Sequence, residues 1–243
     1  MNNVYLSVII PAYNEQAAIR NTIKETIQFL NTHAFNYEII IVDDGSKDDT
    51  VGEAKKAAKE FNSDIIILEN DINRGKGYSI KKGVMRAKGE IILFFDADLS
   101  TPLESFDKML PFFSHGYDIV MCSRHLPDSE ILVRQSRIRE LAGKIFYKIV
   151  FSFFLKDITD TNCGFKAYQR AIGQELYSLL TINRWGFDAE IIYLAQKRSC
   201  KIKEIPVSWS NKANSKVNVV VAIAETIKEL MQIKVNDWRG RYN

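Results

Sequence analysis

Residues 91–102, IILFFDADLSTP, join an apolar run to two carboxylates, Asp96 and Asp98, that are separated by one alanine. The apolar run predicts a buried strand. On an extended segment, side chains two residues apart project to the same side, so both carboxylates can converge on one cation or polar ligand. Charge at the mouth of a buried strand indicates either a hydrogen-bonded structural corner or a site that holds a hard metal ion against phosphate oxygens.

The chain has 243 residues and a formal net charge of +3. This length suits one large α/β domain or a domain with an extension. The small net charge, without basic runs interleaved with aromatics, argues against nucleic-acid binding. No uncharged apolar run approaches the roughly 18 to 20 residues that span a bilayer, and the first residues do not resemble a signal peptide. Cys122, Cys163 and Cys200 lack metal-ligand spacing, so we expect reduced thiols in a cytosolic protein.

Short β-rich runs alternate with helical patterns through the first half, which is typical of a parallel sheet with crossover helices. Each run is apolar on both faces, as central parallel strands are. The expected strands are residues 6–10, 38–42, 64–68, 90–95 and 118–122. The expected helices are residues 17–31, 48–61, 77–87 and 102–113, with Ser46 and Asp49 as a capping pair and Thr101 before Pro102 as a helix start.

The second half is interpreted as an elaboration of the same domain, because no repeat or low-complexity linker divides the chain. Residues 134–155 form a long helical pattern with a phenylalanine-rich apolar face opposite Lys144 and Lys148. This pattern suits a helix at a membrane interface and, equally, a helix packed on the core. A loop at 160–164, helices at 189–197 and 217–235 and a strand at 202–207 complete the prediction.

Polar segments follow three of the expected strands: residues 11–15 (PAYNE), residues 43–46 (DDGS) and the pair at 96 and 98. Ligands of open α/β sheets collect at the carboxyl ends of the strands, so we expect these segments to form one site. Taken alone, Asp43 and Asp44 fit a turn and a helix cap. An acidic pair of this kind also occurs in receiver domains of two-component signalling, but those domains are much shorter and have no place for a second acidic pair.

Two further segments suggest phosphate binding. Residues 73–77, NRGKG, form a basic glycine turn at the start of an expected helix. The turn matches neither a Walker pattern nor the full Rossmann fingerprint, so by itself it is weak support for a phosphate site. Arg124 follows the fifth expected strand, where an arginine can make a bidentate phosphate contact.

Four motifs, VIIPAYNE, VDDGSKDDT, NRGKG with Gly83 and Gly89, and FFDADLSTP, resemble in order and spacing the inverting family 2 glycosyltransferases. That family has the GT-A fold, an α/β architecture with a mostly parallel central sheet flanked by helices. The resemblance covers nearly the entire chain. It implies a single GT-A domain over residues 1–243, with a nucleotide-sugar-binding half at 1–125 and an acceptor and membrane-facing half at 126–243.

Downstream segments resemble the polyprenyl-phosphate and dolichyl-phosphate sugar transferases, most closely the dolichyl-phosphate β-glucosyltransferases. These segments are DTNCGFKAYQR at 160–170, NRWGFDAE at 183–190, and EIPVSW followed by Asn214, Ser215 and Lys216. The resemblance implies that the donor nucleotide sugar is held by Pro11, Tyr13, Glu15, Asp43 or Asp44, Lys76, Asp96, Ala97 and Asp98. Asp98, with help from Asp96, would bind Mg²⁺ or Mn²⁺ on the diphosphate, where the ion neutralises charge on the departing nucleoside diphosphate.

The family chemistry is a single displacement at the anomeric carbon, and the nucleophile would be a phosphate oxygen of the lipid carrier. A phosphomonoester has its second pKa near about 6, so at neutral pH it hardly needs a general base. Asp188, which the resemblance places among the catalytic residues with Asp98 and Arg124, is therefore a base, a positioning group or a structural residue. Trp185 either stacks on the sugar or packs. The other expected acceptor-binding residues are Arg134, Arg137, Arg139, Ser215 and Lys216, of which at least one arginine should meet the acceptor phosphate.

We therefore expect a metal-dependent inverting enzyme that transfers glucose from UDP-glucose to dolichyl or polyprenyl phosphate. No membrane anchor is expected, so the protein would be cytoplasmic and would contact the cytosolic face of a membrane peripherally. A mannosyltransferase using GDP-mannose is one alternative, which shares DADLSTP and GFKAY but matches less well around Cys163, Trp185 and Trp209. A family 2 transferase with a soluble saccharide or protein acceptor is another. A non-enzymatic nucleotide-sugar-binding module is disfavoured by the intact carboxylate pair.

Overall fold

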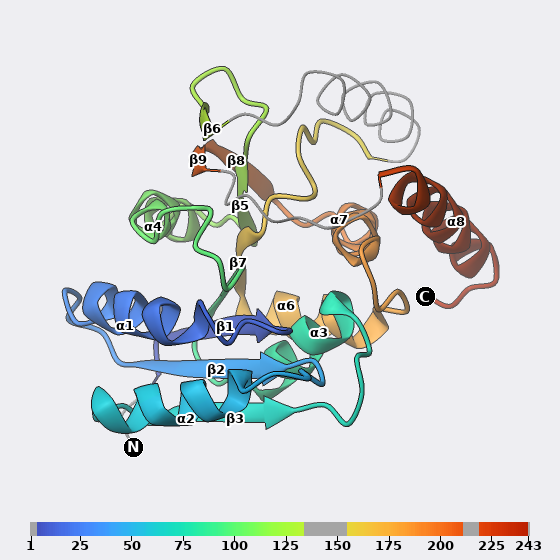
Figure 1. The fold of residues 1–243 in the computed structure, drawn as a ribbon. Coiled ribbons are helices and arrows are strands. Elements are labelled where there is room, and N and C mark those ends of the chain that lie inside the picture. Colours follow the sequence, from blue (N-terminus) through green and yellow to red (C-terminus); the bar gives the residue numbers. More distant parts are fainter. Residues whose placement is uncertain (1–3, 134–154, 211–218, 243) are drawn as a thin grey trace.

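Seven strands form the central sheet of the computed structural model, which describes residues 4–133, 155–210 and 219–242 (Figure 1). The strand order is β3-β2-β1-β4-β7-β5-β8. The pairs β3-β2, β2-β1, β1-β4 and β5-β8 are parallel, whereas β7 runs antiparallel to both of its neighbours. The predicted α/β class with a mostly parallel central sheet is confirmed.

Strands and helices alternate through the first half of the chain, as the apolar pattern predicts. The strands are β1 (Leu6–Ala12), β2 (Tyr37–Asp43), β3 (Ile65–Glu69), β4 (Ile91–Phe95) and β5 (Ile119–Ser123). The helices are α1 (Ile19–Leu30), α2 (Thr50–Glu60), α3 (Lys76–Arg86) and α4 (Ser105–Ser114). Within β1, Val8 and Ile10 pack in one core cluster and Ile9 packs in the other. Burial on both faces therefore explains why these strands read as continuous apolar runs.

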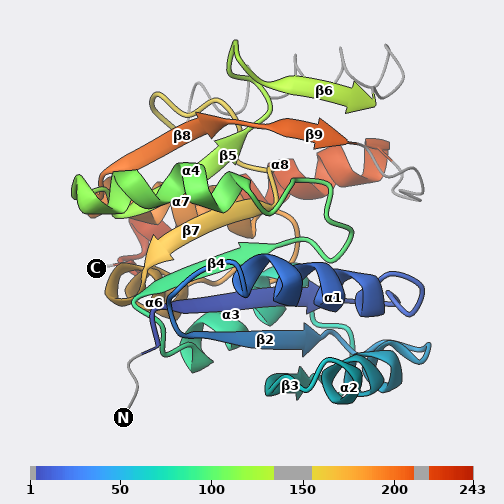
Figure 2. The same cartoon turned by 90° about the vertical axis from the view of Figure 1, so that its left-hand side faces the viewer.

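Helices cover both faces of the sheet, with one layer on each face (Figure 2). Helices α1, α2 and α4 pack on one face, around a core that includes Phe95 and Phe106. The other face is covered by α3 together with α6 (Arg170–Leu179), α7 (Phe187–Lys197) and α8 (Val219–Trp238). Within the described ranges, no helix combines the length and the apolarity needed to cross a bilayer.

Strand β7 (Phe165–Gln169) and helix α6 are absent from the sequence prediction. β7 lies between β4 and β5, with Phe94 opposite Lys166 and Val120 opposite Ala167. Its sequence, FKAYQ, contains lysine, tyrosine and glutamine instead of a continuous apolar run, and both partners are distant in sequence. Its strand conformation therefore depends on tertiary pairing more than on local pattern. The strand predicted at 202–207 is confirmed as β8 (Ile202–Pro206), which lies at the edge of the sheet beside β5.

A second, two-stranded sheet pairs β6 (Glu130–Val133) with β9 (Ser208–Ser210), which the sequence prediction also lacks. The two helix caps expected from the sequence do not form. Helix α2 begins at Thr50, Asp49 makes no side-chain cap bond, and the Ser46 hydroxyl accepts a hydrogen bond from the Asn14 backbone N–H at 2.9 Å. Helix α4 begins at Ser105 instead of Pro102.

Candidate active site

The carboxylates at the end of β4 lie in a turn, since the strand stops at Phe95. The expectation that Asp96 and Asp98 project together from an extended segment is therefore wrong. The Leu99 backbone N–H donates to the Asp96 carbonyl at 3.1 Å, and Leu99 adopts a φ of 51°. Asp98 Oδ1 accepts the Ser100 N–H at 2.8 Å. The turn fixes one oxygen of Asp98, and Thr22 of α1 anchors the carbonyl of Ala97 at 2.5 Å.

Lys76, the first residue of α3, reaches across to this turn. Its Nζ lies 2.5 Å from Asp96 Oδ1. The other face of the Asp96 carboxylate lies against Gly164, where a Cβ atom would come within 2.0 Å of Asp96 Oδ2. The side chain of Asp96 nevertheless stays 37% exposed. A ligand at the end of β4 can therefore reach Asp96.

Charged groups from five segments interact at this edge of the sheet. Burial acts to lower the pKa of Lys76, but Asp96, Asp188 and Asp98 outweigh it and hold that pKa above its usual value. Burial raises the pKa of Glu15, and Asp98, Asp48 and Asp96 raise it further. The structure thus brings together five of the expected site residues, which are Glu15, Lys76, Asp96, Asp98 and Asp188.

Asp188 lies in the first turn of α7 and is buried. Its Oδ1 accepts a hydrogen bond from Lys166 Nζ at 2.5 Å, and the same ammonium group donates to the Cys163 carbonyl at 2.7 Å. Lys166 is itself fully buried, with its Nζ 5.2 Å from the ring centroid of Phe94. Burial raises the pKa of Asp188, whereas Lys166 and Lys76 counteract that rise. The positive end of α7 also favours a carboxylate at this position.

Asp44 fastens the basic glycine turn to the end of β2. Its two oxygens accept the backbone N–H groups of Arg74 and Gly75 at 2.9 and 2.8 Å, and Asn70 donates to it at 2.8 Å. Gly75 has a φ of 104°, and a Cβ there would meet the Asn183 carbonyl oxygen at 2.4 Å. Only glycine fits this position without strain. The turn therefore sets the direction in which Lys76 enters the site.

Asp43 forms a turn, as its sequence context allows, but does not cap a helix. Its Oδ2 accepts the N–H groups of Gly45 and Ser46 at 3.1 and 3.0 Å. Its Oδ1 is buried and, among the side chains that the structure describes, stands without a hydrogen-bond partner. An unmet buried acceptor is costly, so this oxygen suits a ligand that donates a hydrogen bond.

Arg124 makes a bidentate ion pair with Asp160, with its Nε 2.7 Å from Oδ2 and its Nη2 2.9 Å from Oδ1. Its guanidinium also lies 5.4 Å from the ring centroid of Trp209. Asp160 is held in turn, because its backbone N–H donates to Glu204. One edge of the guanidinium is thus already engaged, so phosphate binding by Arg124 stays a prediction.

The remaining expected site residues differ in exposure. Trp185 is 53% exposed and Tyr13 is exposed, while Pro11 is half-buried within β1. The expected helix at 134–155 lies almost entirely outside the described residues, and so do Arg134, Arg137, Arg139, Ser215 and Lys216.

Comparison with known proteins shows the family of the chain. Residues 7–176 match the family model described as glycosyl transferase family 2. The chain belongs to glycosyltransferase family 2. This family 2 glycosyltransferase is 37% identical to the dolichyl-phosphate β-glucosyltransferase of Dictyostelium discoideum, over 96% of this chain and 75% of that protein. It is 33% identical to the enzyme of the same name from Homo sapiens, over 98% of this chain and 77% of that protein.

Solved structures show the same GT-A fold. The glycosyltransferase superposes on glucosyl-3-phosphoglycerate synthase from Mycobacterium tuberculosis in complex with Mn²⁺, UDP-glucose and phosphoglyceric acid, with a TM-score of 0.69 and 19% identity. That match covers 95% of this chain and 79% of the other. The complex of the same synthase with UDP gives a TM-score of 0.68 and 21% identity. The resemblance to GT-A transferases is therefore confirmed.

The residues of this glycosyltransferase fit a divalent ion shared with a substrate. Mg²⁺ is commonly bound through one or two carboxylates together with substrate phosphates. Asp98 has one oxygen held by its own turn, and Asp96 shares one with Lys76. Within the part of the chain that the structure describes, no group of three histidine, cysteine or acidic side chains is arranged to hold a metal. Asp96 and Asp98 could hold an ion only together with oxygen atoms of a substrate.

The sequence analysis did not identify the residues that contact Asp188, Arg124 and Asp96. Lys166, Asp160 and Gly164 belong to the motif-like segment 160–170, but their roles depend on contacts with residues far away in the chain. The signal that could have found Lys166 is a lysine inside an apolar run, which needs a buried carboxylate nearby. The cysteines are all free, as expected.

Proposed function

We propose that this enzyme transfers glucose from UDP-glucose to dolichyl or polyprenyl phosphate, with inversion at the anomeric carbon. The observation that carries this proposal is the 33–37% identity, over nearly the whole chain, to proteins named dolichyl-phosphate β-glucosyltransferase. UDP-glucose as donor is supported by the glucosyl product in those names and by its presence in a structural neighbour.

The charged groups of the candidate site can each be given a role in this reaction. Asp96 and Asp98 would hold Mg²⁺ or Mn²⁺, which supplies positive charge to the diphosphate of the departing nucleotide. Lys76 adds a second cation at the same edge, because it stays protonated beside Asp96. Asp43 presents its unmet Oδ1 as an acceptor for a donating group of the nucleotide.

Asp188 is proposed to position a substrate. The acceptor phosphate is already largely ionised at neutral pH, so removal of a proton contributes little to the reaction. Lys166 fixes one oxygen of Asp188 in an ion pair, which favours the ionised form and a defined orientation. The other oxygen can accept hydrogen bonds from sugar hydroxyls, and Trp185, two residues before the start of α7, offers an exposed ring to the sugar or the lipid.

A donor and acceptor panel tests the proposal. Purified protein is offered UDP-glucose, UDP-galactose, UDP-N-acetylglucosamine and GDP-mannose, each with polyprenyl phosphate and with Mg²⁺, Mn²⁺ or a chelator, and lipid products are identified by mass spectrometry. We expect glucosyl polyprenyl phosphate from UDP-glucose, with a β-linkage, and its loss with the chelator. Mannosyl lipid as the main product, or equal transfer to soluble saccharides in the absence of lipid phosphate, would contradict the proposal.

A further inference from the structure

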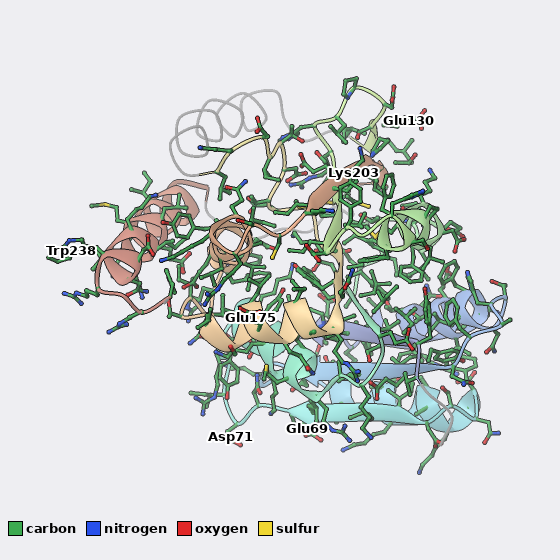
Figure 3. All side chains as sticks on the ribbon, turned by 180° about the vertical axis from the view of Figure 1, so that it is seen from behind. Glu69, Asp71, Glu130, Glu175, Lys203 and Trp238 are labelled. Atoms are coloured by element: carbon green, nitrogen blue, oxygen red, sulfur yellow. The ribbon has the colours of Figure 1, made fainter. Side chains whose placement is uncertain are left out.

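Helix α8 carries an apolar stripe on the side that faces away from the sheet. Four large apolar side chains are exposed, with Met231 at 63% and Trp238 at 87%, together with Ile227 and Val235. At 100° per residue these four positions fall within an arc of about 80° and span about 16 Å of the helix axis. Figure 3 places Trp238 at the margin of the molecule, on the side of α8 that faces away from α7.

Cations flank this stripe on both sides. Lys228 and Arg239 lie on one side of the arc, and Lys234 lies on the other, where its Nζ is 4.6 Å from the ring centroid of Tyr193 in α7. The carboxylates of the same segment point inwards. Glu229 accepts the Gly186 N–H at 2.7 Å, and Asp237 accepts the Tyr193 hydroxyl at 2.6 Å.

These inward contacts fix the orientation of α8 on α7. Glu229 bonds to Gly186, the residue before α7 begins, and Asp237 also pairs with Lys197 at the end of α7. The stripe therefore cannot turn towards the core without breaking bonds at both ends. Near the Ile227 end of the stripe, Glu229 contacts Gly186, which follows Trp185 and precedes Asp188 by two residues in the sequence.

We infer that the outer face of α8 is a docking surface for an anionic lipid bilayer. An apolar strip with a tryptophan at its end and cations along both sides is complementary to a layer of acyl chains beneath negative headgroups. A protein partner would be expected to meet some outward carboxylate as well as cations, and residues 227–241 present none that is fully exposed. The inference deepens the proposed function, because it would place the acceptor end of the site at the surface that carries the lipid phosphate.

Vesicle binding without donor or acceptor tests the surface separately from catalysis. Wild-type protein is sedimented with vesicles of phosphatidylcholine alone or mixed with phosphatidylglycerol, at low and high salt. We expect binding to the mixed vesicles, release by salt and weak binding to the neutral ones. The double variant Met231→Glu with Trp238→Glu should bind the mixed vesicles more than about tenfold more weakly.

Matched variants separate this surface from general effects. Met85→Glu, at an exposed methionine of α3, should bind as wild type does. Lys228→Gln with Arg239→Gln should weaken binding to the mixed vesicles about tenfold or more and leave binding to neutral vesicles unchanged. The thermal midpoints of all variants show that they are folded.

Several results would overturn the inference. One is unchanged vesicle binding by a folded Met231→Glu, Trp238→Glu variant, and another is equal binding of wild type to neutral and anionic vesicles. Concentration-dependent dimerisation that this variant abolishes would assign the stripe to a second copy of the chain.

The vesicle results do not depend on the proposed glucosyl transfer, because the binding experiment contains no substrate. If the docking surface and the proposed reaction are both correct, the Met231→Glu, Trp238→Glu variant should lose turnover of a long-chain acceptor in vesicles. It should keep turnover of a short, water-soluble polyprenyl phosphate.

Discussion

Lys166 is a fully buried lysine whose ammonium group has two defined acceptors, Asp188 and the carbonyl of Cys163. A buried charge is tolerated only when it is paired and hydrogen-bonded. The pair therefore constrains both partners. Under the function proposed above, Lys166 would act on the reaction through Asp188, as a positioning residue.

Replacing Lys166 by methionine should lower kcat by at least about tenfold at neutral pH, because the pKa of Asp188 would rise once its main cation is gone. The acidic limb of the kcat profile should move to higher pH, and Lys166→Arg should restore part of the loss. Stability falls too, since Asp188 is left buried and unpaired. The pair Lys166→Met with Asp188→Asn should recover stability without recovering kcat, as measured by thermal unfolding and by turnover. A Lys166→Met enzyme with an unshifted pH profile would contradict the positioning role.

Gly164 is small because Asp96 lies against it. Gly164→Ala would bring a Cβ within 2.0 Å of Asp96 Oδ2, so the carboxylate should swing away from the turn and the concentration of Mn²⁺ needed for half-maximal rate should rise several-fold. Gly52→Ala is a matched control, since its Cβ would come equally close to the exposed carboxylate of Asp49, away from the site. Equal metal dependence of the two variants would show that the position of Asp96 does not matter.

The sequence allowed prediction of the charged groups that the structure brings together at the end of β4, and not of the groups that hold them. Asp96, Asp98, Lys76 and Asp188 stand in short motifs whose residue types indicate their chemistry. Lys166 is 22 residues from Asp188, and the distance between them depends on the pairing of β7 with β4. No local pattern specifies that pairing.

At the level of elements, the apolar runs of the first half were enough to predict β1 to β5 and their connecting helices. The exact helix starts were not predictable, because capping side chains such as Ser46 found other partners. β6, β7 and β9 were missed because each is short and gains its strand form from a distant neighbour. The segment that precedes β7 is bonded to the end of β5 through the ion pair between Asp160 and Arg124.

That ion pair predicts a specific acid sensitivity. Burial acts to raise the pKa of Asp160, but Arg124 lowers it to about 2. A depressed carboxyl pKa contributes stability that is complete above the ordinary value of about 4 and is lost as the pH falls to about 2. Asp160→Asn should destabilise the protein at pH 7, by no more than the about 3–5 kcal/mol typical of a broken buried pair, because Arg124 is partly exposed.

Denaturant unfolding between pH 2 and pH 7 measures the effect. The stability lost by Asp160→Asn should shrink as the pH falls from about 4 towards 2, where wild type also loses the pair. Asp128→Asn, at an exposed position in the loop after β5, should match wild type throughout. A difference between Asp160→Asn and wild type that stays constant with pH would mean that the pKa of Asp160 is not depressed.

For the whole molecule, a ligand that binds only the folded state stabilises it in proportion to the logarithm of its concentration over Kd. UDP with Mn²⁺ at about 100 times Kd should add about 2.7 kcal/mol, which corresponds to a rise of roughly 5–10 °C in Tm for a chain of this size. The gain from Mn²⁺ over UDP alone should vanish in Asp98→Ala, judged against that variant's own Tm. An unchanged Mn²⁺ increment in Asp98→Ala would exclude Asp98 as a ligand.

The position of β7 also has a consequence for how the chain folds during synthesis. β4 and β5 are complete by residue 123, yet neither has its shared neighbour until residues 165–169 have been made. Until then the nascent chain exposes unpaired edges of both apolar strands, which are templates for pairing with other chains. Ribosome-bound intermediates that end before β7 should therefore depend on chaperones, and release of folded protein should begin only after translation has passed the strand that joins β4 to β5.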